Sequence, residues 1–519
     1  QWIWACWEWL AAWVGKEPYG DKHRDRVNRV KELPIVPVAG HLLRHSDLAG
    51  RIVTWKPDWH EENFPDWLPL TFADDWFRDR IQALPLHEPT VKELCNELGI
   101  MKPETDVVRR AVGQAIEQYW KNKLGDPEQF LRFILDQDWH ETSVASSALQ
   151  RCPVPLSRPL QGEECTEARK AYFGRDWGND LLADLYDGIE TVALVQYDGA
   201  EEKHRRVLEG LGVADCPRIV KESRETYGLQ LSADCGEWKK YLETARDIFG
   251  RRVERISVIS RIEHLSVAGL NRERAVLLVR LIAKRWDGYY RDKMEIIAQG
   301  TQGKERDPRS WKVKAKWWWE VCEKLAVPIR GGSSEHVPLT KCWLPDKKTK
   351  QDIGDLLTVV DLDAFGSDKD IVCNWLVSAV SLRTRIEQVA LNEWKELLST
   401  RIPDVAPAER AASDERLRDK VTRWYAACLE TVADQDKVPE KAFAACPLLC
   451  RRGDSWQYVD KEPRYLDDDN EFTKAFAGDA WLLHVPSRLT AYAVKYFGVP
   501  SLSESVKVHV ERGEPQSPL

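Results

Sequence analysis

Near its C-terminal end the chain reads Cys446-Pro447-Leu448-Leu449, then Arg452-Gly453-Asp454-Ser455-Trp456, then Tyr465-Leu466-Asp467-Asp468-Asp469. The first stretch predicts a short apolar strand, and the glycine of the second predicts a turn into another strand. The third stretch predicts an aromatic and acidic loop. A helical run then ends at Phe497-Gly498-Val499, so these residues are expected to form one small α+β module.

The same order of features recurs earlier in the chain. A proline-flanked strand is expected at residues 33–38 and again at 154–156, each followed by a glycine turn. An aromatic and acidic loop and a helical segment come next in both copies. A third, weaker copy begins at residues 325–329 and lacks a clear Leu-Gly-Val ending.

Three modules end on a glycine between apolar residues: Leu98-Gly99-Ile100, Leu211-Gly212-Val213 and Phe497-Gly498-Val499. Glycine adopts the left-handed conformation that ends many helices without a Cβ penalty, and a buried apolar residue often follows it. We therefore expect a helix end and a positive φ at each of these glycines.

The predicted fold class is α+β, an elongated array of imperfect strand-turn-strand plus helix modules joined by helical inserts. Each module alone has too little apolar core for independent stability, so neighbours are expected to bury one another's faces. The expected division is a helix continuing from a missing upstream part at 1–20, module 1 with a helical insert at 21–150, module 2 with a helical insert at 151–320, module 3 with helices at 321–438, and module 4 at 439–519.

Composition favours a cytoplasmic protein without a membrane partner. The 519 residues carry a net charge of −8, and the longest apolar runs are too short to span a bilayer. The 12 cysteines contain no CxxC pair, so free thiols are expected rather than a zinc site or a disulfide framework. Most of the 24 tryptophans are expected in the core, and helical spacing places Trp2, Trp9 and Trp13 on one buried face.

Three stretches carry a family resemblance: Leu33-Pro34-Ile35-Val36-Pro37, the Ala171-Tyr172-Phe173-Gly174 run with Asp176-Trp177, and Gly498-Val499-Pro500-Ser501-Leu502-Ser503. Together with the Leu-Gly-Val endings, they resemble the region downstream of the ATPase domain in sacsin-like (sacsin/Nov) proteins of prokaryotes. In that family a GHKL-type ATPase domain lies upstream.

The resemblance implies that this chain is a non-catalytic interaction or scaffold region that transmits the nucleotide state of the ATPase to a protein partner. Many prokaryotic relatives lie near defence or nucleic-acid-processing genes, which extends the implication to antiviral defence. ATP, Mg²⁺ and ATPase activity are implied only for the missing upstream domain.

Nothing in the sequence identifies a reaction. There is no GxxxxGK[ST] phosphate loop. The three consecutive acids at 467–469 are expected to point in different directions in a solvated loop. His41 and His45 do not follow a metal-binding helical motif, and Cys446 and Cys450 are expected to be buried thiols. The chain alone is therefore expected to have no catalytic, cofactor-binding or metal-binding residue.

An alternative function is nucleic-acid binding by a basic, aromatic segment. Residues 300–316 are expected to form an exposed loop, in which basic side chains could follow a phosphate backbone and an aromatic ring could stack on a base. A solvated loop without this function is the competing interpretation, and the oligomeric state stays open. The candidate residues are Lys304, Arg306, Arg309, Trp311, Lys312, Lys314 and Lys316.

Overall fold

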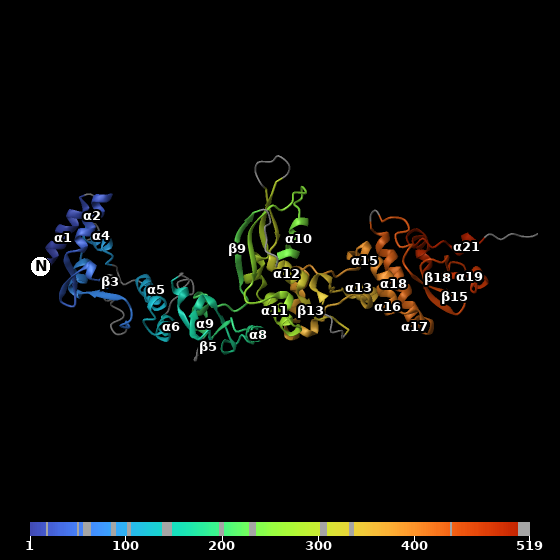
Figure 1. The fold of residues 1–519 in the computed structure, drawn as a ribbon, viewed down its shortest axis with the longest axis horizontal. Helices are drawn as coiled ribbons and strands as arrows, with labels where there is room; N and C mark the ends of the chain where they lie inside the picture. Colours follow the sequence, from blue (N-terminus) through green and yellow to red (C-terminus); the bar gives the residue numbers. More distant parts are fainter. Residues whose placement is uncertain are drawn as a thin grey trace, which may run out of the picture. The chain divides into compact units, whose positions relative to one another are not determined.

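The computed structural model describes residues 1–16, 19–48, 51–55, 64–84, 90–100, 105–137, 148–196, 202–227, 235–301, 309–331, 337–435 and 438–506. Contacts divide the chain into two compact units, Gln1–Arg218 and Ile219–Leu519. Each unit combines helices with several small sheets (Figure 1), which confirms the α+β class.

The second module shows the repeated fold most completely. Its strands β5 (Pro153–Leu160), β6 (Glu163–Glu167), β7 (Ala171–Phe173) and β8 (Ala193–Val195) lie in the order β6-β5-β8-β7. β5 is antiparallel to both of its neighbours, whereas β7 and β8 are parallel. The short helix α8 (Asp180–Leu185) lies in the connection that the parallel pair requires.

The fourth module repeats this topology strand for strand. Its strands β15 (Leu448–Arg452), β16 (Ser455–Val459), β17 (Arg464–Leu466) and β18 (Trp481–Leu483) lie in the order β16-β15-β18-β17, with the same directions. The apolar stretch predicted as a strand begins at Cys446, but the first strand begins two residues later, at Leu448. Cys446 and Pro447 precede the strand ladder.

The first module keeps the same connectivity in two smaller sheets. Strands β1 (Pro34–Val38) and β2 (His41–Arg44) form the hairpin, and β3 (Ile52–Trp55) and β4 (Leu70–Ala73) form the parallel pair. The amide of Asp74, just after β4, donates to the carbonyl of Pro37 at 2.9 Å. Gln196 makes the equivalent bond to Pro155 in the second module at 3.0 Å.

The third module reduces this fold to a hairpin of two-residue strands and single bridges. Its hairpin pairs β13 (Ala326–Val327) with β14 (Val337–Pro338). Asp361 donates to the carbonyl of Pro328 at 2.9 Å, and Trp343 forms a parallel bridge to Val359. Pro37, Pro155 and Pro328 therefore have the same role in three modules. A proline has no amide hydrogen to donate, but its carbonyl accepts the hydrogen bond that joins the hairpin to the parallel pair.

The expected glycine endings are confirmed. Gly99, Gly212 and Gly498 have φ values of +74°, +96° and +66°, and each follows a helical segment. The amides of Ile100 and Val213 donate back to carbonyls five residues earlier, at 2.8 and 3.0 Å, as in a Schellman motif. The aliphatic residue after each of the three glycines is buried.

The third module ends in the same way without glycine. Ser381 has φ +60°, and the next residue, Leu382, is buried and donates to the carbonyl of Leu376 at 3.0 Å. Arg383 then bridges Trp343 in parallel, as Ala214 bridges Tyr172 in the second module. The sequence did not indicate this ending, because serine seldom adopts the left-handed region.

The segment after the second module is not the helical insert that the sequence indicated. It holds a four-stranded antiparallel sheet, in the order β12-β11-β10-β9, between helices. Residues 309–314 form an edge strand rather than an exposed loop, and their register with the preceding strand overrides their polar composition. The strands are β9 (Ile219–Tyr227), β10 (Arg255–Ile262), β11 (Glu295–Gly300) and β12 (Arg309–Lys314).

Helices account for most of the remaining chain. The stretch at 402–413 forms two short helices with a break between them, and it buries Ile402, Ala406 and Ala411. In the first unit the helices are α1 (Trp2–Gly15), α2 (Asp21–Lys31), α3 (Asp75–Gln82), α4 (Thr90–Glu97), α5 (Thr105–Asn122), α6 (Pro127–Asp136), α8 and α9 (Glu202–Gly210). In the second unit they are α10 (Gly236–Thr244), α11 (Arg272–Lys284), α12 (Lys316–Lys324), α13 (Lys347–Ile353), α14 (Lys369–Ser378), α15 (Leu391–Glu396), α16 (Ile402–Val405), α17 (Ala408–Ser413), α18 (Glu415–Ala433), α19 (Asn470–Phe476), α20 (Thr490–Tyr492) and α21 (Leu502–Ser505).

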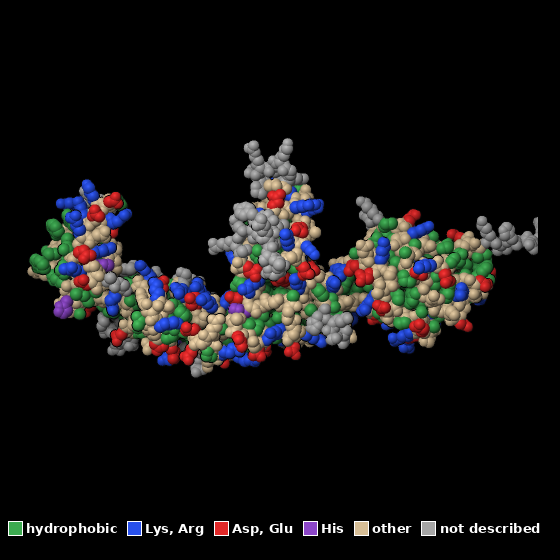
Figure 2. Space-filling view, viewed as in Figure 1, with side chains coloured by type: hydrophobic (Ala, Val, Ile, Leu, Met, Phe, Trp, Pro, Cys, Tyr) green, Lys and Arg blue, Asp and Glu red, His purple; other side chains and the backbone are tan. Residues whose placement is uncertain are grey.

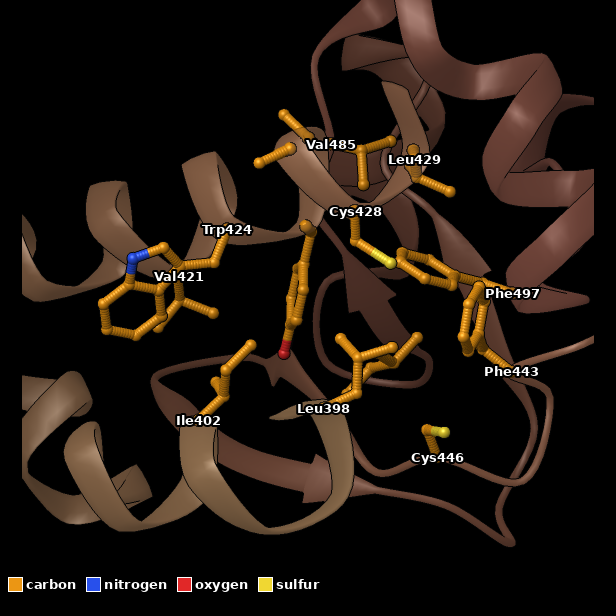
Figure 3. Packing of buried hydrophobic residues seen from close by; sticks show 14 of the residues in the cluster. Leu398, Ile402, Val421, Trp424, Cys428, Leu429, Phe443, Cys446, Val485 and Phe497 are labelled. Carbon is orange, nitrogen blue, oxygen red and sulfur yellow. The ribbon is translucent and has the colours of Figure 1, made fainter. Parts of the chain in front are cut away.

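Neighbouring modules share hydrophobic cores within each unit. In the second unit, α18 contributes Trp424 and Cys428 to a cluster that also contains Phe443 and Phe497 of the fourth module (Figure 3). In the first unit, one cluster joins side chains of β3 and β4 to those of α5, α6 and the second module. The modules therefore stabilise one another through common apolar cores.

Two substitutions test the left-handed endings. We expect Gly212→Ala to destabilise the first unit by about 1 kcal/mol or more, because its φ is positive and the new Cβ would lie 3.3 Å from the Arg169 backbone. Ser381→Gly should stabilise the second unit by up to about 1 kcal/mol, because it removes a left-handed serine. Urea unfolding measures both, with Gly236→Ala, which has open space and no positive φ, as the control. A stable Gly212→Ala variant together with a destabilised Ser381→Gly variant would contradict the shared ending.

Candidate interaction surfaces

Helix α1 is held in place by tryptophans on its inner face. Trp7 is fully buried, donates from its indole Nε1 to the carbonyl of Ile35 at 3.1 Å, and lies with its ring 4.9 Å from that of Phe77. Trp4 is also buried, and its indole donates to Glu8 at 2.7 Å. These contacts fix the rotation of α1, and therefore fix which residues face outward.

The outer face of α1 carries a second set of tryptophans. Trp2 is 74% exposed and Trp9 is 64% exposed, and the ring of Trp9 stacks at 6.2 Å on that of Trp13, which is half-buried and also packs against the core. Cys6 lies between them, and hydrophobic side chains gather over this helix in Figure 2. We call Trp2, Cys6, Trp9 and Trp13 the outer stripe of α1. Exposed aromatic groups of this size are typical of binding surfaces.

The expectation that Trp2 and Trp9 are core residues was therefore wrong. The helix has apolar residues at helical spacing on both sides, at 2, 6, 9 and 13 and at 4, 7, 11 and 14. Periodicity alone fits either set. Only the packing against β1 and α3 decided that the second set is buried.

The basic segment does not form one surface among its described residues. Lys304 and Arg306 lie outside the described residues. Arg309 and Trp311 point to one face of β12, and Lys312 points to the other, because side chains alternate along a strand. Lys314 follows Lys312 on that second face and is half-buried.

Trp311, Lys312 and Lys316 of this segment each contact a different part of the fold. Trp311 is half-buried, and its ring lies close against Gly300. A Cβ added to that glycine would be 2.9 Å from the ring. Lys312 pairs with Glu295 at 3.0 Å. Lys316 is buried between Glu222 and Glu320, at 3.5 and 3.7 Å, and these carboxylates raise its pKa against the opposing effect of burial.

The acids at 467–469 point in different directions, as expected; Asp468 is exposed and the other two are half-buried, and all three carboxylates also make hydrogen bonds within the fold. Asp467 accepts from the hydroxyl of Thr473 and lies 3.6 Å from Nδ1 of His484. Asp468 accepts from the hydroxyls of Ser501 and Ser503, and Asp469 caps the N-terminus of α19. Asp467 and Asp469 both hold α19, and Asp468 holds the segment at 501–503.

Asp467 and His484 are the one histidine–carboxylate contact of this module with resolved pKa shifts in both partners. The contact with the carboxylate raises the pKa of His484, and the contact with the imidazole lowers that of Asp467. The Thr473 hydroxyl donates to the carboxylate rather than to the imidazole, so the described geometry does not provide an activated nucleophile.

The cysteines are unpaired thiols, and most of them are buried. All 12 cysteines are unpaired, and burial raises the pKa of Cys450 to about 12, which keeps that thiol protonated. His41 is exposed on β2, and burial lowers the pKa of His45. Across the described part of the chain, no group of three His, Cys, Asp or Glu side chains could hold a metal ion, and no helix could cross a bilayer.

A cavity of about 640 Å³ lies in the third module beside the buried ring of Trp343. The guanidinium of Arg383 lies 4.2 Å from the centre of this ring and pairs with Glu393. The two charge signs are balanced in its lining, so the cavity does not favour a cationic or an anionic ligand. Its charged residues are Lys341, Arg383, Glu393, Glu396, Arg401 and Asp404.

Comparison with known proteins found no relative of this chain. No family model matches the chain, and searches of curated proteins and of solved structures give no match either.

The Asp467–His484 contact predicts a pH dependence. A raised histidine pKa stabilises the folded state below about pH 6.5, and this stabilisation is lost as pH rises through the folded pKa; a lowered carboxylate pKa stabilises above about pH 4. The contact should therefore contribute most between these limits. NMR titration should give a His484 pKa above its ordinary value, which falls in Asp467→Asn. An unchanged His484 pKa in that variant would contradict the assignment.

Proposed function

We propose that this chain is a non-catalytic interaction scaffold, and that a protein partner binds the outer stripe of α1. The observation that carries the proposal is the exposure of Trp2 and Trp9 on a helix whose other face is tightly packed. The shared cores of neighbouring modules support the scaffold role, because they couple each module to the next within a unit.

The outer stripe has the spacing of a helix that binds in a groove. Its members lie at 2, 6, 9 and 13, which is i, i+4, i+7 and i+11. Helices that bind in apolar grooves present their anchors in this pattern. The partner should therefore offer an apolar groove at least three helical turns long.

The two exposed tryptophans can supply a large part of the free energy of binding. Burying the exposed part of a tryptophan is worth roughly 3 kcal/mol at about 25 cal/mol per Å². Two such residues supply much of the roughly 8 kcal/mol that corresponds to micromolar affinity. The fixed rotation of α1 also lowers the entropy lost on binding, since the helix is already ordered.

The resemblance to sacsin-like proteins extends the proposal. On that basis the scaffold transmits the nucleotide state of a GHKL ATPase to the partner, and nucleotide chemistry belongs to the ATPase domain. The buried thiols and the structural roles of the acids at 467–469 are consistent with a chain that has no catalysis of its own.

Binding by the outer stripe is tested with a photo-crosslinking residue at the exposed Ala5, beside the stripe, in cells, followed by affinity measurements on the purified partner. Trp2→Ser with Trp9→Ser should weaken binding by at least about 100-fold, because buried tryptophans at interfaces each contribute 2 kcal/mol or more. The fold should be unchanged, since both side chains are exposed. Tyr19→Ser, at another exposed aromatic residue, is the control. Affinities of the double variant and the control within twofold of one another would contradict the proposal.

The absence of a nucleotide site in this chain is tested separately. Titration calorimetry of ATP and Mg²⁺ into the purified chain should give no binding heat. An ATP site needs backbone donors around the phosphates and a metal-holding side chain. Gly300 lies instead at the end of a strand, against the carbonyl of Arg252. Micromolar ATP affinity would show that the chain has a nucleotide site.

A further inference from the structure

The turn between α10 and β10 exposes two adjacent large apolar side chains. Ile248 is 92% exposed and Phe249 is 56% exposed. α10 ends at Thr244, so Ile248 is not on the buried face of a helix. We call Ile248 and Phe249 the apolar apex.

The apex is held rigidly by the residues beside it. The carboxylate of Asp247 accepts from the amides of Phe249 and Arg251, at 3.0 and 2.7 Å, and from the guanidinium of Arg251 at 2.8 Å. Both charged side chains of this pair are buried. Gly250 supplies a left-handed residue, with φ +81°. The exposure of the apex is thus imposed by an ordered turn.

Arginines surround the apex. Arg246 and Arg252 form an antiparallel bridge, so their side chains lie on the same face, and like charges in this position repel one another. Arg309 of β12 adds a third guanidinium, 5.7 Å from the ring centre of Phe249. We call Arg246, Arg252 and Arg309 the arginine collar.

The collar is not neutralised within the described part of the chain. There, no carboxylate lies within salt-bridge distance of Arg246, Arg252 or Arg309. Glu254, two residues after Arg252, accepts from the hydroxyl of Thr301 at 2.9 Å. The turn therefore combines an apolar apex with cations that lack an anion.

We propose that this turn binds the surface of an anionic phospholipid bilayer, with Ile248 and Phe249 entering the headgroup boundary and the arginine collar at the lipid phosphates. A bilayer offers both chemistries at the required depth, because its apolar region begins just below a layer of phosphates. This site is independent of the outer stripe of α1 and goes beyond the proposed scaffold function. It also departs from the expectation of no membrane partner.

Nucleic acid fits this turn less well. A base could stack on Phe249, but the most exposed residue of the apex is Ile248, which has no π face. The collar could bind phosphates of either ligand. The isoleucine therefore favours the bilayer over a single strand.

Flotation of the full chain with vesicles tests the proposal. Vesicles of phosphatidylcholine with 30% phosphatidylserine should bind the chain at 0.1 M salt, and vesicles of phosphatidylcholine alone should bind it at least tenfold less. Ile248→Ser with Phe249→Ser should lower binding to the anionic vesicles at least tenfold. Arg246→Gln with Arg252→Gln should lower it several-fold and reduce its salt dependence. Ile297→Ser, at an exposed isoleucine on β11, should leave it unchanged.

Each contrary outcome overturns the proposal. No flotation of the unaltered chain with anionic vesicles excludes the bilayer. Flotation that is lost in Trp2→Ser with Trp9→Ser, but kept in the apex variant, moves the membrane contact to α1. Binding of a 20-nucleotide single strand that is lost in the Arg246 and Arg252 variant, without vesicle binding, assigns the turn to nucleic acid instead.

Discussion

Every module of this protein depends on one backbone constraint, a residue in the left-handed conformation at the end of its last helical segment. That residue reverses the chain so that the next side chain enters the core. In modules 2, 3 and 4 the following residues then bridge the strand of the parallel pair at Tyr172, Trp343 and Leu466. Without this reversal, the parallel pair would lose its outer neighbour and the apolar residue would be exposed.

The constraint explains how one topology survives with very different sequences. The third module has only single bridges where the second has strands, and serine where the others have glycine. It is nevertheless well packed, because its helices share a core with the fourth module. The cost of a left-handed serine is offset by the burial of Leu382 and by cooperation with the neighbouring module.

The proposed interaction surfaces lie outside the repeated fold. The outer stripe is on α1, which precedes the first hairpin, and the apolar apex is in the sheet that follows the second module. Within the modules, by contrast, charged residues mainly tie segments together, as the acids at 467–469 and the buried Asp368, which lies 2.6 Å from Arg280, illustrate. A scaffold of this kind keeps its repeats for stability and presents its contacts on added elements.

The sequence by itself determined the recurring strands, the prolines and glycines that bound them, and the left-handed endings at Gly99, Gly212 and Gly498. These features depend on local backbone preferences. It did not determine the sheet at 219–314, since polar residues such as Lys312 and Lys314 become a strand only through their partners on β11. Nor could it decide which tryptophans of α1 are buried, because both faces have helical periodicity. The arginine collar joins residues 246 and 309, and the left-handed ending of the third module uses serine; both required the fold. Local backbone geometry depends on short stretches of residues, whereas burial and contacts between distant side chains depend on long-range packing.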